Sequence, residues 1–246
     1  MTTTHIEKLL PNKTYTAKTV LAGSFVPSPA GFAVQGSCFV HEELYTAVLY
    51  HGENNSERTR IFVTDIEGNI LRVSEEMDLQ HANCLTYVEK EGLIHVSSCQ
   101  PTYNGYYKIA PATLTVTEQG VLEKPFFAMA YDPKTDRYAS GEWAGQTLDV
   151  WDGELNLLYS KDVERSSSTS QGLFCNEKEL YFVRWNPNEI LRYDWNLNFL
   201  GRVHLSFDLD VEPEDINVIN GKTYITCNLS GVVFVYCITQ FSLAEK

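Results

Sequence analysis

The sequence is poor in basic side chains and has no long apolar run. Its 246 residues include 19 lysines and arginines against 32 aspartates and glutamates, which gives a formal net charge of −13. Nucleic-acid binding needs a basic stripe that neutralises phosphates, so nucleic acid is not an expected partner. A membrane-spanning helix needs about 18 or more consecutive apolar residues, and no run approaches that length, so no membrane partner is expected.

The N-terminus lacks the apolar core of a secretory signal, because residues 1–15 read MTTTHIEKLLPNKTY. We therefore expect a cytoplasmic protein, or a secreted one if a leader has been removed. The sequence also lacks a phosphate-binding loop, a dinucleotide fingerprint, a G-x-S-x-G motif and zinc-ligand spacing. We accordingly predict no cofactor and no bound metal.

Cysteine is present, but not in the spacing of a small disulfide-bonded secreted domain. Most of the six cysteines lie in apolar, strand-like stretches, and we interpret them as buried free thiols. They are Cys38, Cys84, Cys99, Cys175, Cys227 and Cys237.

The most informative feature that is present is an internal repeat. QGLFCNEKELY at 171–181 matches QGSCFVHEELY at 35–45, with Gln-Gly first and Leu-Tyr last. EDINVINGKTY at 214–224 is a third copy, and altered copies begin near residues 81 and 125. The starts at 35, 81, 125, 171 and 214 are separated by 46, 44, 46 and 43 residues. Near-equal units of this length, rich in short strands, are typical of one four-stranded blade each.

A second repeat, D-x-x-x-N-apolar-Leu, occurs at 65–71, 152–158 and 194–200. Each copy follows an alternating apolar run, and this pattern predicts a β-hairpin. The hairpins would form the two outer strands of the first, third and fourth blades.

These repeats predict an all-β fold. We expect residues 1–246 to form a single five-bladed β-propeller with four antiparallel strands per blade. The last blade has three clear strands, and an open ring would leave an unpaired edge. We therefore predict that residues 14–22 supply its outer strand and close the ring, the alternative being residues 241–244. Residues 1–13 are interpreted as a loose arm.

In a propeller, the residue that begins each inner strand lies near one mouth of the central channel. In this sequence those positions are an amide, an imidazole, a proline, an amide and a carboxylate, so the ring is not symmetric. Asymmetry favours one ligand on the axis over five equal pockets. We predict that one small polar ligand, such as a sugar or another glycan, binds there. The predicted ligand-binding residues are Gln35, His81, Asn83, Gln171, Glu214 and Asp215, with Trp143, Trp185 and Tyr106 as rim aromatics.

Three alternatives stay open. In the first, the protein is a metal-independent cyclase, lyase or transferase in which His81 and Glu214 act as the acid/base pair. In the second, it is a protein-interaction platform that uses one flat face. In the third, the polar mouth residues only satisfy backbone groups and channel water. The acidic segment 208–215 could hold Ca²⁺, although it lacks the EF-hand glycine and a solvated loop is the default interpretation.

The repeat skeleton resembles the plant and bacterial glutaminyl cyclase propellers. The resemblance rests on Gln35-Gly36, on Gln171-Gly172 and on the segment EPEDINVINGKTY at 212–224; the second blade has His81-Ala82 where that family has Glu-Gly. HANCLTY at 81–87 is also similar to a motif of uncharacterised propellers from Gram-positive bacteria and their phages. These resemblances imply a five-bladed propeller of bacterial or phage type.

Overall fold

The computed structural model describes residues 2–53, 56–98, 104–122, 124, 126–142, 147–163 and 169–244. Apart from a short 3₁₀ helix, η1 (Ile6–Lys8), its regular elements are strands. The first ten are β1 (Thr2–Thr3), β2 (Lys13–Phe25), β3 (Ala33–Val40), β4 (Glu43–His51), β5 (Glu57–Thr64), β6 (Ile70–Val73), β7 (Cys84–Val88), β8 (Leu93–Ser97), β9 (Gly105–Ala110) and β10 (Thr115–Val121). The others are β11 (Ala128–Asp132), β12 (Arg137–Gly141), β13 (Thr147–Asp152), β14 (Leu157–Asp162), β15 (Thr169–Cys175), β16 (Glu179–Trp185), β17 (Glu189–Asp194), β18 (Phe199–Ser206), β19 (Glu212–Ile219), β20 (Lys222–Leu229) and β21 (Val232–Leu243).

Three blades are separate four-stranded antiparallel sheets. Blade one is β3-β4-β5-β6, blade two is β7-β8-β9-β10 and blade three is β11-β12-β13-β14. The remaining strands form one nine-stranded sheet in the order β15-β16-β17-β18-β2-β21-β20-β19, with β1 paired to β21. Within that sheet, blade four is β15–β18, and blade five is β19, β20, β21 and β2. Strands β18 and β2 run parallel, and their pairing joins the two blades.

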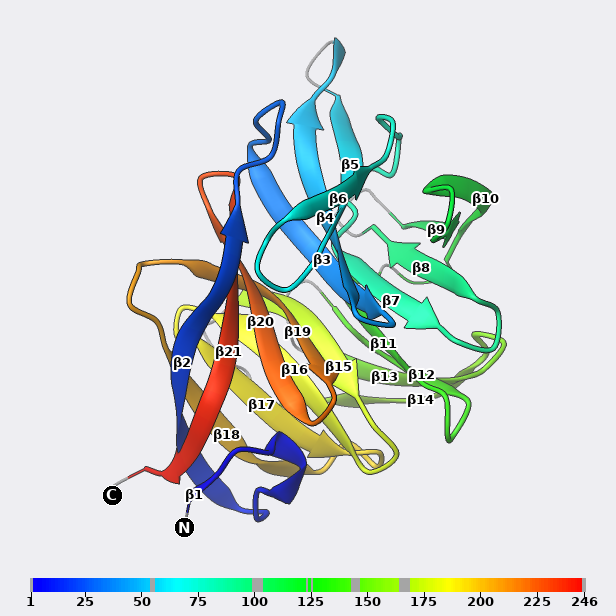
Figure 1. The fold of residues 1–246 in the computed structure, drawn as a ribbon. Coiled ribbons are helices and arrows are strands. Elements are labelled where there is room, and N and C mark those ends of the chain that lie inside the picture. The colour runs from blue at the N-terminus through cyan, green and yellow to red at the C-terminus, as the bar shows by residue number, and fades with distance from the viewer. Residues whose placement is uncertain are drawn as a thin grey trace.

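The last blade is closed by the N-terminal strand, as predicted. Figure 1 shows β2, in blue, running beside β21, in red, although the two lie at opposite ends of the chain. Tyr15 pairs with Leu243 at one end and Phe25 pairs with Val233 at the other. The alternative fails because residues 241–243 belong to β21 itself, the strand that β2 extends.

The inner strands β3, β7, β11, β15 and β19 form a closed ring, because each contacts the next and β19 contacts β3. Each begins within three residues of its predicted start. Two glycines of the repeat permit this close approach. A Cβ on Gly36 would overlap the backbone of Cys84, and a Cβ on Gly172 would overlap Asp215. The predicted all-β ring of four-stranded blades is therefore confirmed.

The three D-x-x-x-N segments are hairpin turns between the third and fourth strands of their blades, as predicted. In each turn the aspartate accepts hydrogen bonds from both the backbone and the side chain of the asparagine. In the third copy, Asn198 N lies 2.8 Å from Asp194 Oδ1 and Asn198 Nδ2 lies 3.0 Å from Oδ2. This local pairing replaces backbone bonds that a turn leaves unmade.

The N-terminal arm is not loose, and that prediction was wrong. Ile6 is 1% exposed and Leu9 is 4% exposed, and both belong to the apolar core between blades four and five. Their burial holds the arm against the blades because removing apolar surface from water is favourable. Arg192 Nη2 also donates to Leu9 O at 2.8 Å.

The cysteines of the described part agree with the sequence interpretation. All five are free thiols, of which four are buried and Cys237 is half-buried. Cys99 lies outside the described residues. Burial raises the pKa of the Cys38 and Cys84 thiols well above the usual value, so both are inert, apolar fillers of inner strands.

Candidate functional site

The candidate site is the hub, which is the space enclosed by the five inner strands. Three of these strands bulge at the positions that the repeat singled out. The register with the neighbouring strand shifts between Val34 and Ser37, between Ser170 and Leu173, and between Pro213 and Asp215. A bulge bends the strand and re-aims a side chain. The bulged residues are Gln35-Gly36, Gln171-Gly172 and Glu214.

At the upstream mouth of the hub, where the inner strands begin, polar side chains pair across blades. Asn83 Nδ2 of blade two donates to Gln35 Oε1 of blade one at 3.3 Å. Gln171 Nε2 of blade four donates to Glu212 Oε1 of blade five at 2.7 Å. The ring thus brings side chains that are far apart in the sequence within hydrogen-bonding distance.

Asp215 anchors the middle of the hub. Its Oδ2 accepts from Ser37 N at 2.7 Å, and its Oδ1 accepts from Ile216 N at 2.8 Å. Burial raises the pKa of the Asp215 carboxyl well above its usual value, while hydrogen bonds from the backbone of Ser37, Ile216 and Leu173 oppose that rise. The carboxyl therefore ties blades one, four and five together.

Glu214 is a buried carboxyl of the hub with an unsatisfied oxygen. The residue is 3% exposed, and its Oε1 has no hydrogen-bond partner among the described residues. Burial raises the pKa of its carboxyl well above the usual value, and the nearby carboxylates of Glu212 and Asp215 raise it further. Such a group destabilises the folded protein unless something binds it, and functional sites often contain groups of this kind.

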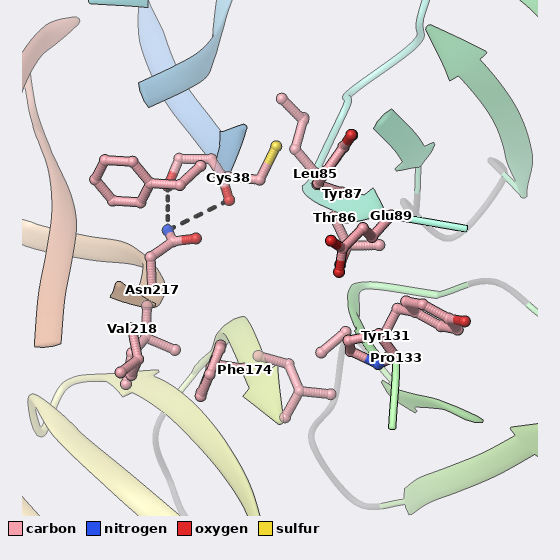
Figure 2. Close-up of a pocket in the computed structure, with 15 residues that line it drawn as sticks. Cys38, Leu85, Thr86, Tyr87, Glu89, Tyr131, Pro133, Phe174, Asn217 and Val218 are labelled. Atoms are coloured by element: carbon pink, nitrogen blue, oxygen red, sulfur yellow. Dashed lines mark hydrogen bonds between the residues drawn. The ribbon is translucent and has the colours of Figure 1, made fainter. Parts of the chain in front are cut away.

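A pocket of about 200 Å³ opens at the downstream mouth, where the inner strands end. Residues from all five inner strands line it, and Figure 2 shows their side chains arranged around an open centre. Asn217 Nδ2 donates to Ser37 Oγ at 3.0 Å, and Ser37 Oγ lies 2.8 Å from Thr226 Oγ1. The amide oxygen of Asn217 lies on the side of the open space (Figure 2). Thr86 and Glu89 add acceptors, and aromatic rings complete the wall: Phe39, Tyr87, Tyr131 and Phe174.

His81 contacts a carboxylate of the neighbouring blade. Its Nδ1 is 2.7 Å from Glu57 Oε2 at the start of β5, and its backbone N donates to Ser98 Oγ at 2.6 Å. Besides burial, the charges that raise the pKa of Glu214 are those of Glu212 and Asp215. The acid/base roles of His81 and Glu214 in the enzymatic alternative stay predictions.

Two of the three predicted rim aromatics, Tyr106 and Trp185, belong to the described residues. Tyr106, on β9, is 7% exposed, and its hydroxyl lies 2.5 Å from His95 Nδ1, between blades two and three. It is part of a blade interface, because it belongs to an apolar cluster with Tyr138 and Trp151 of blade three. Trp185 is 37% exposed at the end of β16. Trp143 and the mouth residue Pro125 lie outside the described residues.

Three residues of the hub escaped the sequence analysis, namely Ser37, Glu212 and Asn217. Each lies within three residues of a predicted mouth position on the same inner strand. The repeat alignment therefore contained a signal for them, since a strand carries successive residues along the channel at about 3.3 Å per residue.

The acidic segment 208–215 divides into two parts. Asp208 accepts the Tyr236 hydroxyl at 2.6 Å, whereas residues 212–215 belong to β19 and reach the hub. Within the described ranges, no group of three or more His, Cys, Asp or Glu side chains is arranged to hold a metal ion. No helix in the part of the chain that is described has the length and apolar character of a membrane span.

Comparisons with known proteins bear on the fold. No protein-family model and no curated protein matches the sequence. The structure is similar to that of the β-propeller domain of Cps50 (Swd1) from Myceliophteria thermophila, with a TM-score of 0.53 and 8% sequence identity. The match covers 90% of this chain and 100% of that chain. The fold is a β-propeller. Likeness at this identity says nothing of what the propeller binds.

Proposed function

We propose that the protein binds one small polar ligand in the hub of the propeller. The observation that carries the proposal is the pocket at the downstream mouth, which residues from all five inner strands line. Ligand sites are typically concave, with a few placed polar groups among apolar walls. Here Asn217 and Ser37 are the placed polar groups, and aromatic rings from other blades form the walls.

The asymmetry of the hub supports one ligand rather than five. Blades one and five contribute Ser37 and Asn217, whereas blade four contributes Phe174 at the same level. A polar side and an aromatic side together suit a sugar-like molecule, whose hydroxyls form hydrogen bonds while its C–H face packs on a ring. The upstream residues Gln35, Asn83, Gln171, Glu214 and Asp215 would extend the site along the axis.

Origin and compartment stay proposals. The Gln-Gly pairs at 35–36 and 171–172 suggest a relation to glutaminyl cyclase propellers, and HANCLTY at 81–87 suggests one to propellers of Gram-positive bacteria and phages. We infer from them a bacterial or phage protein, and we propose that it is cytoplasmic.

A ligand screen tests the proposed site. Thermal-shift assays would compare neutral sugars, sugar acids and amino acids on the wild type and on three variants. Asn217→Ala removes a pocket amide, His81→Ala tests the predicted contribution of that side chain, and Gln119→Ala is a control on an exposed outer strand. We expect one compound class to bind the wild type and the Gln119 variant equally, and the Asn217 variant at least tenfold more weakly. The proposal would be overturned if no compound binds, or if the compound that binds has the same affinity for the Asn217→Ala variant as for the wild type.

A second variant separates binding from stability. Replacing Glu214 by Gln removes a buried carboxyl with a raised pKa, so the variant should be more stable at neutral pH by roughly 1–3 kcal/mol. The difference should vanish at acidic pH, where the wild-type carboxyl is protonated. Urea denaturation at several pH values measures this. A loss of stability at neutral pH would mean that the carboxylate has a stabilising partner in the fold.

A further inference from the structure

A groove between blades one and five lies beside the hub pocket on the same face of the propeller. Its volume is about 390 Å³. The turns β3–β4, β5–β6 and β19–β20 border it, and Phe39 lines both the groove and the hub pocket. The two cavities therefore adjoin, so that a groove runs from the axis to the rim.

The floor of this groove is apolar and open to solvent. Phe39 and Tyr224 pack against each other with their ring centroids 5.7 Å apart. Ile66 and Ile219 continue the floor, and Leu71 is 49% exposed at its outer end. A large apolar side chain that is half exposed in a groove is a feature of binding surfaces rather than of cores.

The rim of the groove is acidic, and two of its carboxylates have no internal role. Glu43 is held by Arg72, 2.5 Å away, and Asp65 holds the turn through Asn69. Glu42 and Glu67 are exposed, and neither has an ion-pair partner in the described part of the chain. These two carboxylates therefore present uncompensated negative charge beside an apolar floor.

We propose that this groove docks an extended segment of a partner protein in which apolar side chains are flanked by lysine or arginine. Charge complementarity selects the basic flanks, because an acidic segment would be repelled by Glu42 and Glu67. The apolar floor selects the central side chains. A second copy of this chain is a poor occupant, since its net charge of −13 opposes self-association. Docking in this groove does not require a ligand in the hub.

Fluorescence anisotropy with a labelled hexapeptide, in which Leu-Phe stands between two lysine pairs, tests this proposal. The matched peptides keep the lysines but replace Leu-Phe by Gly-Ser, or keep Leu-Phe but replace lysine by glutamate. We expect the first peptide to bind more tightly than both. Binding should weaken about five- to tenfold in the double variant Glu42→Gln, Glu67→Gln and about as much in Leu71→Ala.

The control variant is Glu7→Gln, which removes one exposed carboxylate from the N-terminal arm. Its affinity for the peptide should equal that of the wild type. Equal binding of the Gly-Ser peptide would mean general attraction to an acidic protein, and would overturn the proposal. Unchanged binding by the double variant would overturn it too. Sedimentation that shows a wild-type dimer, dispersed by Leu71→Ala, would identify a second copy as the occupant instead.

Discussion

Blades four and five are joined by the hydrogen-bonded strands β18 and β2, and a buried ion pair within blade four holds the N-terminal arm, whereas blades two and three meet through a histidine and two tyrosines. At the first seam, Arg192 is fully buried, and its Nη2 lies 2.7 Å from Glu179 Oε2. The same guanidinium donates to the carbonyls of Leu9 and Leu10, so one side chain fastens the N-terminal arm to blade four.

The other seam depends on a neutral imidazole. His95 is 1% exposed, its Nε2 lies 3.0 Å from Glu91 Oε2, and its Nδ1 lies 2.5 Å from the Tyr106 hydroxyl and 3.2 Å from that of Tyr138. Burial lowers the pKa of His95 to about 4. The neutral ring therefore donates to Glu91 and accepts from a tyrosine.

The two contacts differ in the side chain at their centre, which is a guanidinium in one and an imidazole in the other. A guanidinium keeps its charge at every ordinary pH, so the anchor of the N-terminal arm contains no basic group that loses or gains a proton between pH 7 and pH 4. An imidazole does gain a proton in acid, so the seam between blades two and three is expected to be the more sensitive of the two to acid.

Replacement of Arg192 by Ala should have the largest effect on stability. It leaves the mostly buried Glu179 carboxylate and the carbonyls of the arm without their donor. We expect a loss of about 3–5 kcal/mol in the free energy of unfolding, measured in urea. Lys134→Ala removes an exposed lysine that pairs with Glu177, and should cost less than about 1 kcal/mol. Equal losses would show that the buried pair is no more important than a surface pair.

The second largest effect is expected from acid, which should weaken the seam between blades two and three. Because the folded-state pKa of His95 is below its unfolded value of about 6.5, the neutral ring stabilises the protein above that pH. This contribution should decline as pH falls from about 6.5 to about 4, by up to roughly 3 kcal/mol in total. The pKa of Glu91 is also lowered, by Lys108 and His95 against the opposing effect of burial, so its protonation acts in the same direction.

The comparison for this prediction is His95→Gln, which cannot gain a proton. Thermal unfolding between pH 7 and pH 4 should show a steep fall in the wild type and a shallower one in the variant. Parallel curves would assign the acid lability to carboxylates elsewhere in the protein.

The smallest of these effects concerns the pairing of β18 with β2. Gly201 has φ +135°, and a Cβ there would overlap the carbonyl of Lys13. Gly201→Ala should therefore cost roughly 1–3 kcal/mol. Gly120, on the outer strand of blade two, has nothing within 4 Å of such a Cβ, so Gly120→Ala should be neutral or slightly stabilising. A neutral Gly201 variant would mean that the two strands can separate without consequence.

The repeat explains how much of the fold could be predicted. Strand order within each blade, the hairpin turns and the closing strand all follow from local patterns, because alternation and turn residues act over a few positions. The pairing of β18 with β2 did not follow. It joins residues 201–206 to residues 13–18, and no local pattern reports such a contact.

The site was harder to predict than the fold. The repeat marked Gln35, Gln171 and Glu214 because bulges recur at equivalent positions. It could not give the partner of His81, since Glu57 belongs to the third strand of the preceding blade. Side-chain direction at a mouth depends on the bulge and on the neighbouring blade, and neither is visible in one repeat unit.

The closing strand has a consequence for biosynthesis. β2 is completed within the first 25 residues, yet its partner β21 begins only at Val232. At about 5–20 residues per second, ribosomes need roughly ten to forty seconds to make the intervening chain. Tyr15 and Ala17 are both buried in the finished protein. Throughout that interval they are not covered by β21, which has not yet been made. Nascent chains of this protein should therefore engage chaperones at their N-terminal end until translation is complete.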